Sequence, residues 1–166
     1  MTVPESQGWF VVNVADAPWI RNERGGDWCF FEPREARFPE IGVNIRLLRP
    51  GQPNALYHSE NTQENFLVLS GECICLVEGE ERRLKAWDFV HCPPGTRHTF
   101  VGAGEGPCAI LMIGGRREGK TLHYPVDEQA ATYGASAPEE TDDPRLAYRE
   151  WPSEFTPIPA EWPPES

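Results

Sequence analysis

The sequence predicts an all-β protein, either a sandwich or a small barrel. Short runs of aliphatic, aromatic and β-branched residues follow one another through the middle of the chain, with Gly, Pro or Asn between them. Residues 41–48 alternate apolar and polar side chains, the period of a strand with one buried face. No segment with helical periodicity appears before residue 120. These observations favour one β domain for the 166 residues.

The expected elements fall into three segments. Residues 1–35 carry two N-terminal strands, at 10–14 and 28–32, that flank the barrel. Residues 36–116 form the barrel core, where the expected strands are IGVNIRLL, ALYH, NFLVLS, CICLV, RRL, DFVHC, HTFV and CAILMI. The EGEE sequence between CICLV and RRL predicts a hairpin turn in which Gly79 takes a positive φ.

The third segment, residues 117–166, is an acidic, Pro-rich C-terminal arm. Residues 127–133 predict a short helix that ends before Gly134, and residues 142–151 predict a second helix with Pro144 in its first turn. The rest of the arm has five prolines and no periodic pattern, so it is expected to be extended. Its apolar anchors are Trp151, Phe155, Ile158 and Trp162. They predict an arm that packs on its own barrel or on a partner subunit.

The charge pattern argues against nucleic-acid and membrane partners. The net charge is −11, and −8 of it falls on residues 118–166. No Lys/Arg cluster exists to neutralise phosphates or anionic lipids. No run approaches the length of a membrane span, and the N-terminus lacks the pattern of a secretory signal. Five cysteines without a C-x-x-C pair predict reduced, buried thiols in a cytoplasmic protein.

Two stretches, residues 51–71 and 87–102, carry a candidate metal site. The candidate ligands are His58, Glu60, Glu64 and His98. His58 and Glu60 are two residues apart, so on a strand they share a face. The other two lie at the starts of neighbouring expected strands, where an antiparallel barrel brings side chains together. Imidazole nitrogens and carboxylate oxygens bind divalent transition metals such as Fe, Mn, Zn or Ni. A metal-free barrel in which these groups satisfy one another is the alternative.

These stretches resemble the two sequence motifs of the cupin superfamily. The residues that match the motifs are Gly51, His58, Glu64 and Gly71 in the first, and Pro93, Gly95 and His98 in the second. The resemblance covers about residues 40–115. It implies a double-stranded β-helix, or jelly-roll barrel, that holds one divalent transition metal ion. It also implies a homodimer, through sheet-on-sheet contacts or exchanged terminal segments.

The first motif departs from the cupin pattern at both histidines. The first one, His58, lies one place later than the strict spacing from Gly51, which falls on Tyr57. Where the pattern has His-x-His, this chain has His58-Ser59-Glu60. Glu60 is therefore a substitute ligand, a catalytic base that removes a proton from bound substrate, or a solvated carboxylate. In the second motif, Trp87 and Gly102 replace a Gly and an Asn.

Four further residues are candidates for the pocket around the ion. Phe66 and Phe100 share strand parity with Glu64 and His98 and would form apolar walls. His91 is expected in the core, where it would orient a ligand. Arg46 alternates with an apolar stripe, so it either faces solvent or lines the barrel and binds a substrate carboxylate.

Two classes of function agree with these features. The first is a metal-dependent enzyme that acts on a small polar molecule, as a dioxygenase, an isomerase or a decarboxylase. The second is a non-catalytic module that binds or senses a small molecule. Fold alone does not separate them.

Overall fold

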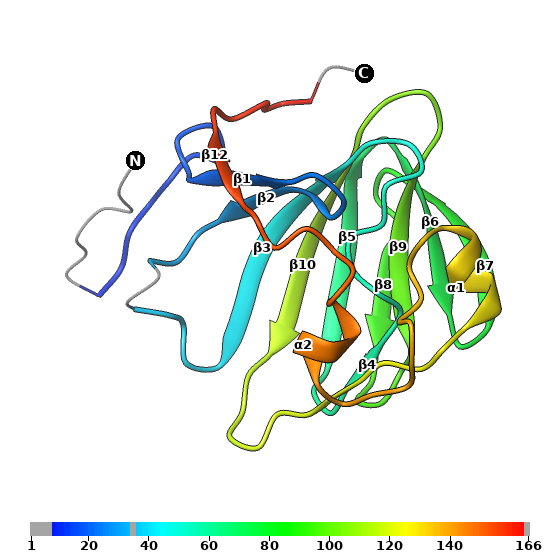
Figure 1. Cartoon of the computed structure of the whole chain (residues 1–166). Coiled ribbons are helices and arrows are strands. Elements are labelled where there is room, and N and C mark those ends of the chain that lie inside the picture. Colours follow the sequence, from blue (N-terminus) through cyan, green and yellow to red (C-terminus); the bar gives the residue numbers. More distant parts are fainter. Residues whose placement is uncertain (1–7, 34–35, 165–166) are drawn as a thin grey trace.

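The structure, a computed structural model, describes residues 8–33 and 36–164 (Figure 1). Strands dominate this part of the chain, and both of its helices are short. The strands are β1 (Trp19–Asn22), β2 (Gly26–Phe30), β3 (Ile41–Leu48), β4 (Ser59–Glu60), β5 (Glu64–Ser70), β6 (Glu72–Val77), β7 (Glu80–Lys85), β8 (Phe89–Cys92), β9 (His98–Ala103), β10 (Cys108–Gly115), β11 (Leu122–His123) and β12 (Thr156–Ile158). The helices are α1 (Glu128–Thr132) and α2 (Pro144–Ala147).

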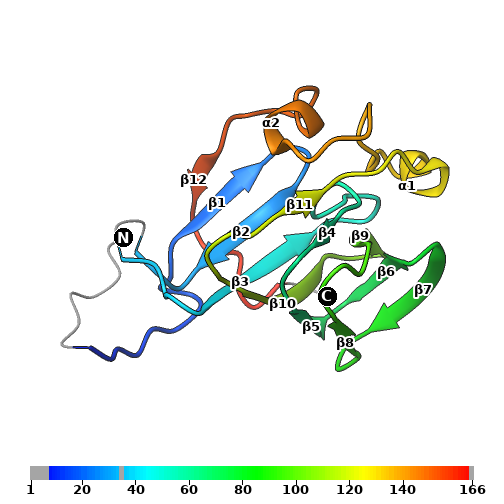
Figure 2. The same cartoon turned by 90° about the horizontal axis from the view of Figure 1, so that it is seen from below.

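The strands form a jelly-roll barrel, which confirms the predicted all-β class. One sheet has the order β12-β1-β2-β3-β10-β5-β8, a second has the order β7-β6-β9, and β11 pairs with β4. Figure 2 shows the β7-β6-β9 sheet against the β10-β5-β8 end of the larger sheet, from which β2, β1 and β12 extend. Gly79 has a φ of +78° in the turn between β6 and β7, as predicted.

The pairing of β3, β10 and β5 decides which side chains face the interior. Ile110 of β10 lies opposite both Arg46 of β3 and Val68 of β5. Residues directly opposite on paired strands point to the same face of a sheet. Val68 and Ile110 belong to the main core cluster, together with Phe66 and Phe100. The inner face of β3 therefore carries its even-numbered residues, Arg46 included.

The outer face of the same sheet is also covered. Ile45 and Leu47 of β3 pack there with Trp19 and Cys29 of the N-terminal strands. Val12, which lies in the segment before β1, packs on this cluster. The larger sheet is therefore buried on both faces along β3.

Two of the expected strands do not form. Residues 10–14 pair with no other strand, although Val12 and Val14 pack on the outer cluster. The ALYH segment is mostly irregular and is tied to β9 by an isolated bridge between His58 and His98. In both segments apolar burial, the basis of the prediction, is present without a ladder of backbone hydrogen bonds.

The first helix of the arm begins and ends within one residue of its prediction, whereas the second begins as predicted but ends at Ala147 rather than at residue 151. The Asp127 carboxylate accepts a hydrogen bond from the Ala130 N–H at the start of α1, and Gly134 follows with a φ of +66°. Asp143 caps α2 in the same way, with Pro144 in its first turn.

The arm packs on its own barrel. β12 pairs with β1, as Figure 1 shows, and the rings of Trp162 and Trp19 lie 6.1 Å apart. Tyr148 packs on a cluster that contains Leu56 and Tyr124. Within the described residues, no helix is long and apolar enough to cross a membrane.

Candidate metal centre

His58 and His98 face each other because their backbones are paired. The His98 N–H donates to the His58 carbonyl at 2.8 Å, and the His58 N–H donates to the His98 carbonyl at 3.2 Å. This antiparallel bridge places the two imidazole centroids 5.2 Å apart. Both residues are buried, with exposed fractions of 9% and 2%.

Both rings are held with the same nitrogen directed inward. Nδ1 of His58 lies 2.7 Å from the Leu56 carbonyl, and Nδ1 of His98 lies 3.0 Å from the Thr96 carbonyl. A carbonyl oxygen only accepts, so each Nδ1 carries the proton and donates it. Each Nε2 is then left with a free lone pair, which is the arrangement of a metal-binding histidine.

Glu64 completes a group of three at the start of β5. Its Oε2 lies 3.3 Å from Nε2 of His98, and one ligand atom from each of Glu64, His58 and His98 lies within 4.8 Å of the others. Ligand atoms sit about 2.0–2.2 Å from a zinc-like ion, so two of them on opposite sides are about 4.4 Å apart. A small inward shift therefore closes the group around one ion, and its residues fit the metal that the sequence predicts.

The environment favours the neutral forms of Glu64 and His98 but the charged form of His58. Burial and the nearby Glu60 carboxylate raise the pKa of Glu64 to about 7. Burial and His58 lower the pKa of His98 to about 4. Burial alone would lower the pKa of His58, but interactions with Glu60 and Glu64 raise it. A divalent cation would stabilise the deprotonated form of all three, because its charge replaces that of the protons.

Glu60 lies beside the group of three but is turned toward the arm. Its Oε2 is 2.5 Å from Nζ of Lys120 and accepts a hydrogen bond from the Thr62 hydroxyl at 3.2 Å. Its Oε1 is 3.8 Å from Nε2 of His58. Burial alone would raise the pKa of Glu60, but the interactions with His58 and Lys120 lower it to about 2. The structure thus gives Glu60 a cationic partner that competes with any metal ion for its carboxylate.

Phe66 and Phe100 lie where the sequence predicts pocket walls. Their ring centroids are 4.6 Å apart, and the Phe66 centroid is 5.1 Å from that of His98. Both rings are buried in the main core. They form an apolar floor under His98 and exclude water from that side of the group.

His91 does not lie in the core, and the expectation that it lines the pocket is wrong. It is exposed on β8, and its Nδ1 is 2.8 Å from Oδ1 of Asn65. Asn65 is an odd-numbered residue of β5, so it points to the outer face. Arg46 shows the opposite result, because it is buried on the inner face and the solvent-facing alternative does not hold.

Three residues that surround the group were not predicted from the sequence. Lys120 binds Glu60, the Tyr124 ring stacks on His58 at 5.6 Å, and Tyr148 contacts Tyr124 at the same centroid distance. All three come from the C-terminal arm, more than 50 residues after His58. Only the return of the arm over the barrel brings them to the site.

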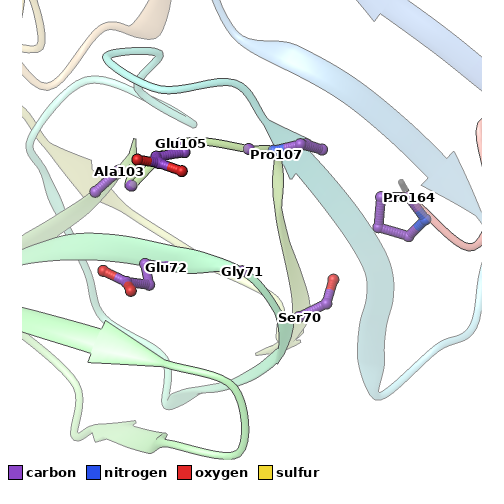
Figure 3. A pocket seen from close by; sticks show the side chains of 9 residues that line it. Ser70, Gly71, Glu72, Ala103, Glu105, Pro107 and Pro164 are labelled. Atoms are coloured by element: carbon purple, nitrogen blue, oxygen red, sulfur yellow. The ribbon is translucent and has the colours of Figure 1, made fainter. Parts of the chain in front are cut away.

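A pocket also exists at the other end of the barrel (Figure 3). It is lined by Ser70, Gly71, Glu72, Ala103, Gly104, Glu105, Gly106, Pro107 and Pro164. Ser70 and Ala103 are the last residues of β5 and β9, whereas Glu64 and His98 are the first. The two sites are therefore separated by the length of the barrel.

The barrel and its inward-facing histidines are features of the cupin fold. A sequence profile described as "Cupin domain" matches residues 44–114, which include His58, Glu64 and His98. The domain match over residues 44–114 and the fold together support membership of the cupin superfamily. A comparison with curated proteins finds no match.

Three solved structures show what the fold is similar to. A sugar phosphate isomerase of the cupin superfamily from Silicibacter pomeroyi is 24% identical, with a TM-score of 0.55 over 61% of this chain and 66%, just under two thirds, of that chain. A predicted oxalate decarboxylase from Thermotoga maritima is 20% identical, with a TM-score of 0.57 over 65% of this chain and 100% of that chain. The polyketide cyclase RemF from Streptomyces resistomycificus is 14% identical, with a TM-score of 0.57 over 68% of this chain and 83% of that chain. At these identities the likeness establishes the fold.

Proposed function

We propose that this cupin is a metal-dependent enzyme that acts on a small polar molecule. The observation that carries the proposal is the buried group of His58, Glu64 and His98, in which both imidazoles are fixed with Nε2 inward. Three protein ligands leave coordination positions open for a substrate. A purely structural site would close those positions with further protein ligands.

The surrounding residues would bind and orient the substrate. A divalent ion held by His58, Glu64 and His98 would supply Lewis acidity to a substrate oxygen. The Phe66 floor would exclude water beneath it. Glu60, held as an anion by Lys120, would accept a hydrogen bond from a substrate hydroxyl at the rim.

Glu60 is also the candidate catalytic base, under one condition. A carboxylate with a pKa of about 2 is a weak base at neutral pH, because general bases work best with a pKa near the operating pH. Proton removal by Glu60 therefore requires Lys120 to move away first. The reaction would belong to the dioxygenase, isomerase or decarboxylase type, and two of the structural neighbours are named for the last two.

The same ion pair favours the second candidate, a non-catalytic module that binds or senses a small molecule. If Lys120 stays on Glu60, the site has a metal and a pocket but no strong base. Turnover separates the two functions. We expect conversion of at least one compound among small catechols, diketones and sugar acids in aerobic assays with Fe(II) or Mn(II), and binding without conversion across the panel would favour the second function.

Metal analysis tests the common part of both functions. We expect about one equivalent of transition metal in the purified protein and a large loss in His98→Ala. His91→Ala is the matched control, because His91 is exposed on the outer face. A wild-type protein without metal, or equal metal contents in wild type and His98→Ala, would overturn the proposal.

We further propose a homodimer in the cytoplasm. Trp9 and Val11 support the dimer, because their side chains are 78% and 84% exposed and lie beside an apolar groove. Such large exposed apolar side chains are often covered by a second subunit. All five cysteines are free and buried, which suits a reducing compartment.

A further inference from the structure

Arg46 is a buried arginine without an acidic partner. The residue is 9% exposed and points to the interior from β3. Its Nη1 donates to the Gly25 carbonyl at 3.0 Å, and its guanidinium lies 3.5 Å from the centroid of the Trp28 ring. Among the described residues, no carboxylate oxygen lies within 4.0 Å of it. A guanidinium has five N–H donors, so most of its donors have no protein acceptor.

An unpaired buried charge destabilises a fold. Burial lowers the pKa of Arg46 to about 10, and the nearby Tyr148 phenol offsets this effect only in part. The guanidinium still carries its charge at neutral pH. Replacement of a buried charged group by an apolar side chain is often neutral or stabilising. The stack on Trp28 and the single hydrogen bond to Gly25 offset only part of the cost of burying the charge, so packing alone does not explain an arginine at this position.

Two further polar atoms on the same face lack partners. Nε1 of Trp28 and Oδ1 of Asn44 are buried and make no hydrogen bond. Trp28 lies directly opposite Arg46 on β2, and Asn44 lies two residues before it on β3. All three side chains thus lie on the same face of the sheet. Buried polar atoms are nearly always paired, so a cluster of unpaired ones marks a place where a ligand supplies the partners.

We propose that Arg46, Trp28 and Asn44 form a subsite for the carboxylate end of a small hydroxy acid. The carboxylate would accept hydrogen bonds from the guanidinium and from the indole N–H, which only donates. A ligand hydroxyl would donate to Oδ1 of Asn44. The single positive charge of Arg46 matches one carboxylate, whereas a phosphate dianion would leave a negative charge buried. The inference rests on the proposed function, because it names the substrate class of that enzyme.

The C-terminal arm connects this subsite to the metal group. Tyr124 stacks on His58 and contacts Tyr148. The Tyr148 phenol interacts electrostatically with both Arg46 and Glu60. Tyr148 therefore lies near both sites.

Gluconate is a suitable probe, and calorimetric titration of the full chain is the measurement. We expect gluconate to bind wild type and Arg46→Met to weaken it by about 100-fold or more, as for loss of a buried charged partner. Trp28→Phe, which keeps the ring and removes the donor, should weaken it by about tenfold. Arg83→Met is the control at an exposed arginine and should bind as wild type does. Sorbitol and inorganic phosphate should bind far more weakly than gluconate.

Urea unfolding separates a ligand-binding role from a structural one. Without ligand, we expect Arg46→Met to be at least as stable as wild type. A clear loss of stability in Arg46→Met, with gluconate affinity unchanged in Trp28→Phe, would show that Arg46 is structural and would overturn the subsite. Gluconate, sorbitol and phosphate binding with equal affinity, or not at all, would overturn it too.

The metal content of the same samples shows whether a negative result refutes the Arg46 subsite or the proposed metal-dependent enzyme. Wild type with bound metal, in which gluconate affinity does not depend on Arg46, would refute the subsite alone. Wild type without metal, in which gluconate still binds through Arg46, would refute the metal enzyme and support the subsite.

Discussion

Nζ of Lys120 lies 2.5 Å from Oε2 of Glu60, and this ion pair joins the C-terminal arm to the rim of the metal group. Glu60 is not one of the three residues whose ligand atoms lie within 4.8 Å of one another. The carboxylate that replaces the second histidine of the cupin motif is thus already paired within the chain. The role of Glu60 therefore depends on its ion pair with Lys120 rather than on its position in the motif.

The two glutamates should respond differently to the same substitution. We expect Glu64→Gln to lower metal affinity at least tenfold, about the loss seen when residues that only support a ligand are changed. Glu60→Gln should keep its metal and lose about 100-fold in turnover if Glu60 acts as the base. Metal analysis after dialysis, followed by kinetics, measures both effects. Loss of metal in Glu60→Gln would show instead that Glu60 is a ligand.

Asp27 should make stability depend on pH in the acid range. Its side chain is fully buried and accepts hydrogen bonds from Arg21 at 2.7 Å and from Arg49 at 3.2 Å. Burial alone would raise its pKa, but these bonds lower it below the ordinary value of 3.8. Because the folded pKa lies below the unfolded one, the stabilisation is present above about pH 4 and is lost as pH falls through the folded pKa.

Urea unfolding between pH 3 and pH 7 measures this contribution. We expect Asp27→Asn to lose about 1–3 kcal/mol at pH 7, because it removes the buried anion and leaves Arg21 and Arg49, both partly exposed, with Glu161 as their remaining partner. The variant should also show a smaller loss of stability below pH 4. Glu72→Gln is the control, since its pair with Arg83 is exposed and contributes little. Equal pH profiles for wild type and Asp27→Asn would contradict the prediction.

The sequence predicted the barrel and the histidines well because both depend on local patterns. Alternation over residues 41–48 predicted the bounds of β3 correctly. The two sequence motifs and the turn before His98 predicted that His58 and His98 lie together. The fate of Glu60 was not predictable, because Lys120 reaches it only after the arm has folded back. The alternation of residues also could not predict which face of the sheet Arg46 occupies, because both faces of β3 are buried.

Gly102 shows why the second motif departs from the cupin pattern. The Gly51 N–H donates to its carbonyl at 2.8 Å, and a Cβ at position 102 would lie 2.2 Å from the Arg49 carbonyl oxygen. We therefore expect Gly102→Ala to lose about 1–3 kcal/mol of stability, as overpacking does in other cores. Gly79→Ala is a matched control with open space around its Cβ, although its positive φ adds some strain of its own. A thermal unfolding midpoint for Gly102→Ala equal to that of wild type would contradict the close approach.

The exposed N-terminal segment should hold the proposed dimer together. The apolar groove beside it is lined by Gly8, Trp9, Phe10, Val11, Val12, Phe31, Phe38 and Val43. Two copies that cover this surface would remove Trp9 and Val11 from water, and burial of such side chains contributes about 1.5–3 kcal/mol each. We expect a dimer mass for wild type by light scattering at micromolar concentration and a monomer mass for the double variant Trp9→Asp, Val11→Asp. Trp87→Asp, at a tryptophan that is 74% exposed outside the groove, should remain dimeric. A monomeric wild type would refute the dimer, and a monomer produced by Trp87→Asp alone would move the interface to the β8 side of the barrel.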